Sequence, residues 1–145
     1  MTPVVRAVAR LLLPPGLVVA TAIIVKGYAD VGDGFSAGVI VALAVSLQYL
    51  ALGPRGAEAT LPILRRAPAV AVAGLLLALA VAFVPVLSGR PLLAHLPPPG
   101  KKPVAIGTLE LITAVVFDVG VFLLVVGVLV VLVHQLARPG EEPRR

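Results

Sequence analysis

The chain contains no cysteine and no tryptophan, and only 13% of its 145 residues are charged. The absence of cysteine excludes disulfides and thiolate-bound metals. The two histidines, His95 and His134, are too few and too far apart in the sequence to indicate a metal site. Soluble domains carry roughly 25% charged residues, whereas 59% of this chain is hydrophobic. The composition therefore predicts a membrane protein and leaves no large region for a soluble enzyme domain.

The net charge of +5 would suggest a nucleic-acid partner in a soluble protein. Here the basic residues flank apolar runs, so we interpret them as anchors at the membrane surface and expect no nucleic-acid partner. No nucleophile–base pair, phosphate-binding loop or cluster of metal ligands is evident in the sequence. We therefore expect a non-enzyme without cofactor or metal. Arg6 and Arg10 before an apolar stretch faintly resemble a signal peptide, but an uncleaved first helix is favoured.

Four apolar segments predict an all-α integral membrane protein with four transmembrane helices in a single domain, residues 1–145. We expect the helices at about 4–26, 34–53, 67–88 and 109–136, with a proline-rich outer loop at about 88–107. Arg10 and Lys26 enclose 15 uncharged residues. These make about 22 Å of helix, which is short for a membrane span. Either both side chains extend to the membrane surface, or one is buried against another subunit.

Four spans would place both termini on one side of the membrane. The ends and the loop on that side carry eight basic residues, and the opposite side carries four. Because cytoplasmic segments are enriched in Lys and Arg, both termini are predicted to be cytoplasmic, in the cell (plasma or inner) membrane. The larger set is Arg6, Arg10, Arg55, Arg65, Arg66, Arg138, Arg144 and Arg145, and the smaller set is Lys26, Arg90, Lys101 and Lys102.

Asp118 is the only formally charged residue between Leu111 and Val133, a run of 23 residues made mostly of Val, Leu and Ile. An ionised acid within a transmembrane helix costs several kcal/mol unless protein, water or a cation compensates it. A lone subunit should not expose such a group to lipid. The sequence therefore predicts a role in ion or proton handling, inside an assembly that shelters the acid. The alternative is a structural hydrogen bond or ion pair that holds two subunits together.

Small residues follow two helix faces. They recur every four residues in the second segment and every seven in the fourth, and Asp118 lies roughly 200° around the fourth helix from Gly120. Such strips let helix backbones approach closely. Both faces of the fourth helix then need protein contacts, and we expect neighbouring subunits to supply them. The two strips are Gly34, Gly38, Ala42 and Ser46, and Thr113, Gly120, Gly127 and His134.

Two motifs resemble a known family. The first junction reads Lys26-Gly-Tyr-Ala-Asp-Val-Gly-Asp-Gly-Phe-Ser-Ala-Gly38, and the fourth segment contains Phe117-Asp-Val-Gly-Val121. Both are similar to motifs of the MnhB/MrpB family, the B-type subunits of multisubunit Na+/H+ antiporters and related membrane-bound complexes. The resemblance implies other membrane subunits as partners, and Na+ or H+ as the transported ion. Tyr28, Val31, Asp33 and Ala37 depart from the family pattern, which indicates a divergent member or a subunit of a related redox complex.

The first junction is expected to be a turn. Gly32 and Gly34 permit positive φ, and Gly38 permits close helix approach; Gly27 and Phe35 belong to the same motif. Asp33 or Asp30 would cap the second helix, whose free N–H groups favour an acid. A capped turn is one interpretation. A cation-attracting mouth formed by the two acids is the other.

Three further groups have two interpretations each. Glu110 is either an entry group leading to Asp118 or an acid at a helix start. Lys26 either pairs with an acid across the bundle or extends to the membrane surface, and His134 is either a proton shuttle or a headgroup-level anchor.

We predict a non-catalytic subunit of a multisubunit cation/proton antiporter, or of an antiporter-like module in a redox complex. It would contribute Asp118, Glu110 and Asp33 to an ion path. The alternative function is purely architectural, with the small-residue strips docking larger transport subunits. A small self-assembling exporter is a weaker third possibility.

Overall fold

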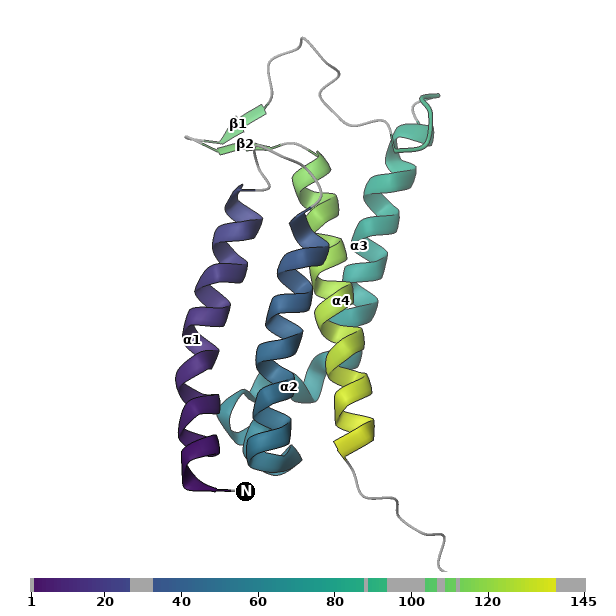
Figure 1. Cartoon of the computed structure of the whole chain (residues 1–145). Coiled ribbons are helices and arrows are strands. Elements are labelled where there is room, and N and C mark those ends of the chain that lie inside the picture. The colour runs from purple at the N-terminus through teal and green to yellow at the C-terminus, as the bar shows by residue number, and fades with distance from the viewer. Residues whose placement is uncertain are drawn as a thin grey trace, which may run out of the picture.

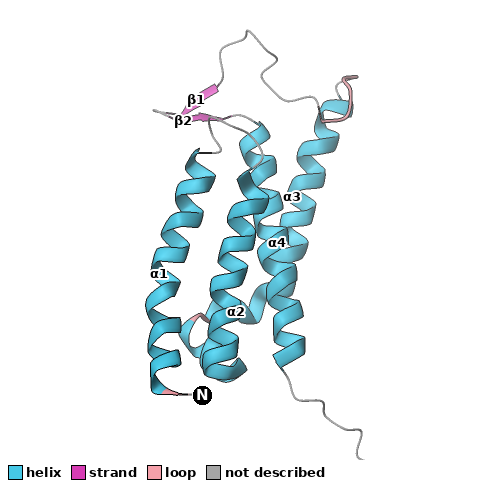
Figure 2. Cartoon of the chain, viewed as in Figure 1, coloured by secondary structure: helices cyan, strands magenta, loops and turns pink. Residues whose placement is uncertain are grey.

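Figure 1 shows the computed structural model, which describes residues 2–26, 33–87, 89–93, 104–106, 109–111 and 113–137. Four long helices form the bundle, a 3-10 helix leads into the third of them, and a two-stranded antiparallel hairpin precedes the fourth (Figure 2). The long helices are α1 (Pro3–Lys26), α2 (Asp33–Thr60), α3 (Ala67–Leu87) and α4 (Thr113–Ala137). The shorter elements are η1 (Pro62–Arg66), β1 (Val104–Ile106) and β2 (Leu109–Leu111).

All four long helices have the length and apolar composition needed to cross a membrane. This confirms the predicted all-α fold with four spans, to which the hairpin adds three residues in each strand. Large apolar side chains such as Leu11, Leu76 and Phe83 are exposed on the outside of the bundle. In a membrane these positions face acyl chains rather than water, so their exposure has no hydrophobic cost.

The helices stand side by side in the order α1, α2, α4, α3 (Figure 1). α4 therefore has a neighbour on each side, running parallel to α2 and antiparallel to α3. α1 packs mainly on α2, and its buried residues are few: Ala9, Leu13 and Ala20. The bundle is a row of four helices in which α2 and α4 hold the inner places.

The described start of α1, the α2–η1 turn and the last residue of α4 lie at one end of the bundle, which we call the terminal end (Figure 1). The hairpin lies at the other end, which we call the hairpin end. Two helices start at the hairpin end, α2 at Asp33 and α4 at Thr113. Their free backbone N–H groups therefore point toward the same end.

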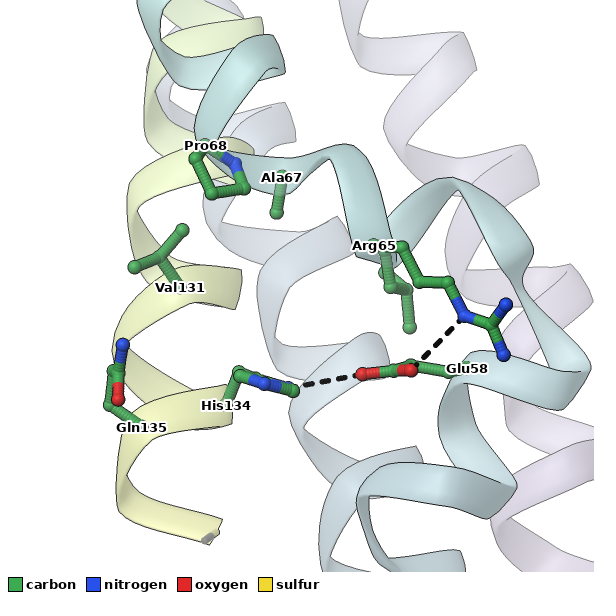
Figure 3. Close-up of a pocket in the computed structure, with 8 residues that line it drawn as sticks. Glu58, Arg65, Ala67, Pro68, Val131, His134 and Gln135 are labelled. Atoms are coloured by element: carbon green, nitrogen blue, oxygen red, sulfur yellow. Dashed lines mark hydrogen bonds and ion pairs between the residues drawn. The ribbon is translucent and has the colours of Figure 1, made fainter.

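α2 continues beyond its predicted end at about residue 53. Its backbone leaves helical geometry at Gly53 (φ 72°, ψ 172°), and a further short helical stretch then runs to Thr60. The positive φ at Gly53 suits glycine, which has no Cβ to clash. Pro54 follows, at a helix start where its missing N–H is tolerated. The long apolar part of α2 thus ends where the sequence predicts, and the extra stretch brings Glu58 back toward the bundle (Figure 3).

α4 starts later than predicted. The expected start was at about residue 109, but Leu109–Leu111 form β2, which pairs with β1 so that Ala105 lies opposite Glu110. A short apolar run does not distinguish a strand from the first turn of an apolar helix, which explains the difference. Only two residues separate the paired Ile106 and Leu109, the commonest length of a hairpin connection. Much of the proline-rich loop lies outside the described residues.

Candidate functional site

α4 packs against α3 at two glycines that the sequence singles out. A Cβ placed on Gly120 would lie 2.8 Å from the backbone nitrogen of Ala78, and one on Gly127 would lie 2.5 Å from that of Ala71. Ordinary Cβ contacts measure 3.4–4 Å, so only a hydrogen atom fits at either position. The helix backbones meet here almost directly, as small residues allow in membranes.

The matching surface on α3 was missed at the sequence level. Its buried side is a strip of small residues and one proline, spaced three to four positions apart. A Cβ on Gly74, near the middle of this strip, would lie 2.6 Å from the carbonyl oxygen of Gly120. The spacing of small residues was a readable signal, but the high overall hydrophobicity of this segment hides it. The strip consists of Ala67, Ala71, Gly74, Ala78, Ala82 and Pro85.

The opposite side of α4 packs against the start of α2. A Cβ on Gly34 would collide with the backbone carbonyl of Asp118, and one on Gly38 would lie 3.0 Å from the Cβ of Val125. Gly34 and Gly38 are thus where the predicted α2 strip contacts α4. The N-terminal end of α2 lies directly against the turn of α4 that carries Asp118.

Asp118 is buried within the single chain, with 8% of its surface exposed. This corrects the expectation that neighbouring subunits must cover both faces of the fourth helix, because α2 and α3 of the same chain cover them. Asp118 is the sixth residue of α4, about 8 Å from the helix start, and so lies nearer the hairpin end than the middle of the helix.

The other predicted path residues are arranged differently from one another. Asp33 is half-buried in the first turn of α2, next to Gly34, and so shares the hairpin end with Asp118. Lys26 is exposed in the last turn of α1 and forms no ion pair with the described residues. Glu110 lies on β2 rather than at the start of α4. Asp30 lies outside the described residues.

The predicted turn residues are described only in part. Gly27 and Gly32 lie outside the described residues. Phe35 is 59% exposed, because it follows Gly34 by one residue and so points about 100° away from the side of α2 that contacts α4. Within this chain Phe35 is therefore not a packing residue.

The middle of the α2–α4 region is apolar. Val41, Val45 and Val130 belong to one buried hydrophobic cluster, together with Ala37 near the hairpin end. These side chains offer no hydrogen-bonding group to an ion or a water chain. The polar groups that lie between α2 and α4 are therefore concentrated at the two ends of the bundle.

The terminal end holds a second polar cluster, which sequence reasoning did not assemble. Glu58, in the stretch after Gly53, accepts from Arg65 Nε at 3.2 Å through Oε2, and its Oε1 lies 3.3 Å from Nδ1 of His134 (Figure 3). The hydroxyl of Tyr49 is also 3.3 Å from this Nδ1, and the Tyr49 and His134 rings meet edge-to-face. Glu58 was not predicted as a site residue, because only the break at Gly53 turns it toward α4.

A cavity of about 340 Å³ opens beside this cluster (Figure 3). Its polar lining comes from three elements, α2, η1 and α4, and its apolar lining comes from η1, α3 and α4. Such a volume accommodates several water molecules. The lining residues are Glu58, Leu64, Arg65, Ala67, Pro68, Val131, His134 and Gln135.

One further polar side chain is buried between α1 and α2. Gln48 is fully buried, and its Nε2 donates to the carbonyl oxygen of Ala9. Its Oε1 has no hydrogen-bond partner among the described residues. This side chain links α1 to α2 and leaves one buried oxygen without a hydrogen-bond partner among the described residues.

The fold and these sites define a class of protein: a multi-pass membrane protein of four spans, with a buried acid in an inner helix. The sequence matches the family model described as "Domain related to MnhB subunit of Na+/H+ antiporter" over residues 4–131. The chain belongs to this MnhB family.

Three relatives support the assignment. A relative from Bacillus subtilis, named as the B-type subunit of a Na+/H+ antiporter, is 34% identical over 117 residues, 81% of this chain and 78% of the relative. Its namesake from Alkalihalophilus pseudofirmus is 31% identical over 111 residues, 77% of this chain and 75% of the relative. A protein of Rhizobium meliloti, named as the probable A/B-type subunit of a K+/H+ antiporter, is 34% identical over 141 residues, 89% of this chain but only 13% of that longer protein.

Proposed function

We propose that this chain is a non-catalytic integral membrane subunit of a multisubunit cation/proton antiporter, with Asp118 as its ion- or proton-binding group. The names of the B-type relatives support the antiporter assignment. The observation that carries the role of Asp118 is its burial in α4, against the N-terminal end of α2. Intramembrane acids that face protein rather than lipid are typical of ion and proton routes.

The apolar middle of the α2–α4 region limits what the chain does alone. Asp118 and His134 are 16 positions apart on α4, about 24 Å along the axis, and Val41, Val45 and Val130 are buried in the hydrophobic cluster of this region. A route that used Asp118 would therefore leave this chain and continue through another subunit. The chain would supply one binding group and would not form a complete channel.

The orientation of the chain is part of the proposal. Arg6 lies near the start of α1, and Arg65 and Arg66 lie in η1, both of which are at the terminal end (Figure 1). The excess of basic residues on that side supports a cytoplasmic position for both termini. The hairpin end, with Asp33 and Asp118, would then lie toward the outer face of the membrane.

The test is an Asp118→Asn variant of the full antiporter complex, assayed for cation-dependent proton movement in membrane vesicles. Asn keeps the size of the side chain but removes its charge, so the complex should assemble while antiport falls at least tenfold. Asp33→Asn, made in parallel, tests whether the half-buried acid of the same end also belongs to the path. Full antiport by assembled Asp118→Asn complexes would refute the role of Asp118.

A purely architectural role is the second candidate. It is favoured by the close glycine contacts that hold α4 rigidly between α2 and α3. In that case Asp118→Asn would lose the complex on native gels rather than its transport. The two outcomes are distinguishable because assembly and antiport are measured on the same membranes.

A further inference from the structure

His134 is placed between two partners that require different states of its ring. Its Nδ1 lies 3.3 Å from Oε1 of Glu58 and 3.3 Å from the hydroxyl of Tyr49. A carboxylate only accepts hydrogen bonds, so Glu58 needs a proton on Nδ1. A tyrosine hydroxyl donates to Nδ1 only when this nitrogen carries a lone pair. One ring nitrogen cannot satisfy both partners in these ways at the same time.

The surrounding charges decide between the two arrangements. Glu58 already accepts from Arg65 on its other oxygen, so each carboxylate oxygen faces one nitrogen. A bare Nδ1 would direct its lone pair at this carboxylate, whereas a protonated Nδ1 donates a charge-assisted hydrogen bond to it. Of the other residues that line the cavity, Gln135 is uncharged, and α3 contributes only Ala67 and Pro68. Glu58 and Arg65 are thus the charged groups facing His134 within the described part of the chain.

The side chains of Tyr49, Glu58 and His134 are largely buried. Tyr49 is 2% exposed, and the side chains of Glu58 and His134 are 18% and 20% exposed. The cavity of about 340 Å³ lies on the same residues, so water reaches a pair that is otherwise enclosed by three elements. Imidazole is the side chain that exchanges protons between pH 5 and 8.

We propose that His134 and Glu58 form a proton-binding site at the terminal end of the chain, separate from Asp118. Nδ1 of His134 holds a proton that it donates to Glu58, and Nε2 takes up a second proton from water in the cavity. The resulting imidazolium forms an ion pair with Glu58. Glu58 lies beyond the break at Gly53. The hydrogen bond from Nδ1 of His134 to Glu58 therefore also holds the α2–η1 turn against α4.

The test is nuclear magnetic resonance of the full chain in lipid nanodiscs, with ¹⁵N in the histidine rings. The chain has only two histidines, so the His134 signals are those that disappear in His134→Gln. At alkaline pH the neutral ring should carry its proton on Nδ1, and acidification should add a second proton on Nε2. A neutral ring with its proton on Nε2, or a ring that stays neutral in acid, would overturn the proposal.

Two variants separate the pair from its surroundings. Glu58→Met removes the acceptor at similar length, so the Nδ1 proton signal should be lost as Tyr49 becomes the donor to Nδ1. Arg66→Met is the matched control, because it removes an exposed cation of η1 that does not line the cavity, leaves Glu58 and Arg65 in place, and should retain the signal. An unchanged tautomer in Glu58→Met would count against the site. Should that variant fail to fold, the wild-type tautomer alone decides. None of these readouts involves transport, so they hold whatever Asp118→Asn does to antiport.

Discussion

The contact between Gly127 and α3 allows the sharpest stability prediction. In Gly127→Ala the new Cβ would lie 2.5 Å from the backbone nitrogen of Ala71 and 2.7 Å from its Cα and Cβ. Reaching the lower limit of an ordinary contact, 3.4 Å, requires a shift of 3.4 − 2.5, about 0.9 Å. The atoms that must move include α3 backbone, which cannot rotate aside as a flexible side chain does. Overpacking of this kind costs about 1–3 kcal/mol, about 5- to 150-fold in the folding constant.

Gly16→Ala is the matched control. Its Cβ would lie 3.2 Å from the Cβ of Ala44, which requires a shift of only about 0.2 Å at the α1–α2 contact. Both variants gain the same intrinsic preference of alanine for helix, up to about 1 kcal/mol. The difference between them therefore isolates the clash at the α3–α4 contact.

The assay uses the absence of native cysteine. Cysteines introduced at the exposed Leu76 of α3 and Leu132 of α4 carry a fluorophore pair, and energy transfer reports helix separation as SDS is added to mild-detergent micelles. We expect Gly127→Ala to separate at clearly lower SDS than Gly16→Ala. Equal midpoints would refute the direct backbone contact between these two helices.

The remaining predictions concern Gln48 and Phe35. Gln48→Met loses the hydrogen bond to Ala9 but also removes an unpartnered buried oxygen. Its free energy of unfolding, measured by SDS titration, should therefore stay within about 1 kcal/mol of the wild-type value. Gln48→Glu at the same fully buried position should destabilise the chain by several kcal/mol, and a tolerated Glu would contradict the dry environment. Phe35→Ala should change the stability of the chain by no more than about 0.5 kcal/mol, because Phe35 is 59% exposed. A large drop in its midpoint would show that Phe35 packs inside the bundle after all.

The helices were predictable because the apolar length that a membrane span needs is a property of each segment alone. A span needs about 20 apolar residues whatever its neighbours are, so three of the four helices begin within one residue of the predicted start. The fourth start was missed because Leu109–Leu111 are as compatible with a strand as with helix. That choice depends on pairing with Val104–Ile106, which lies outside any short window of sequence.

The candidate sites were predictable only in part. A carboxylate inside an apolar run is visible without a structure, so Asp118 was identified directly. Its shelter was assigned to other subunits, because the sequence does not reveal that Gly34 and Gly74 bring α2 and α3 onto opposite sides of α4. Glu58 lies in a polar loop by sequence and acquires a role only through its contact with His134.

The sequence by itself determined that this protein lies in a membrane, that it has four spans, and that Asp118 lies within an apolar span and must be shielded from lipid. Those properties follow from residue polarity and length, which each segment carries independently. Tertiary structure decided the order of the helices, and therefore that two opposite sides of α4 are covered by α2 and α3 of its own chain. It also brought Glu58, Tyr49 and His134 together, since the positive φ at Gly53 redirects the backbone before Glu58. Proximity between residues 85 positions apart is a property of packing that no local pattern encodes.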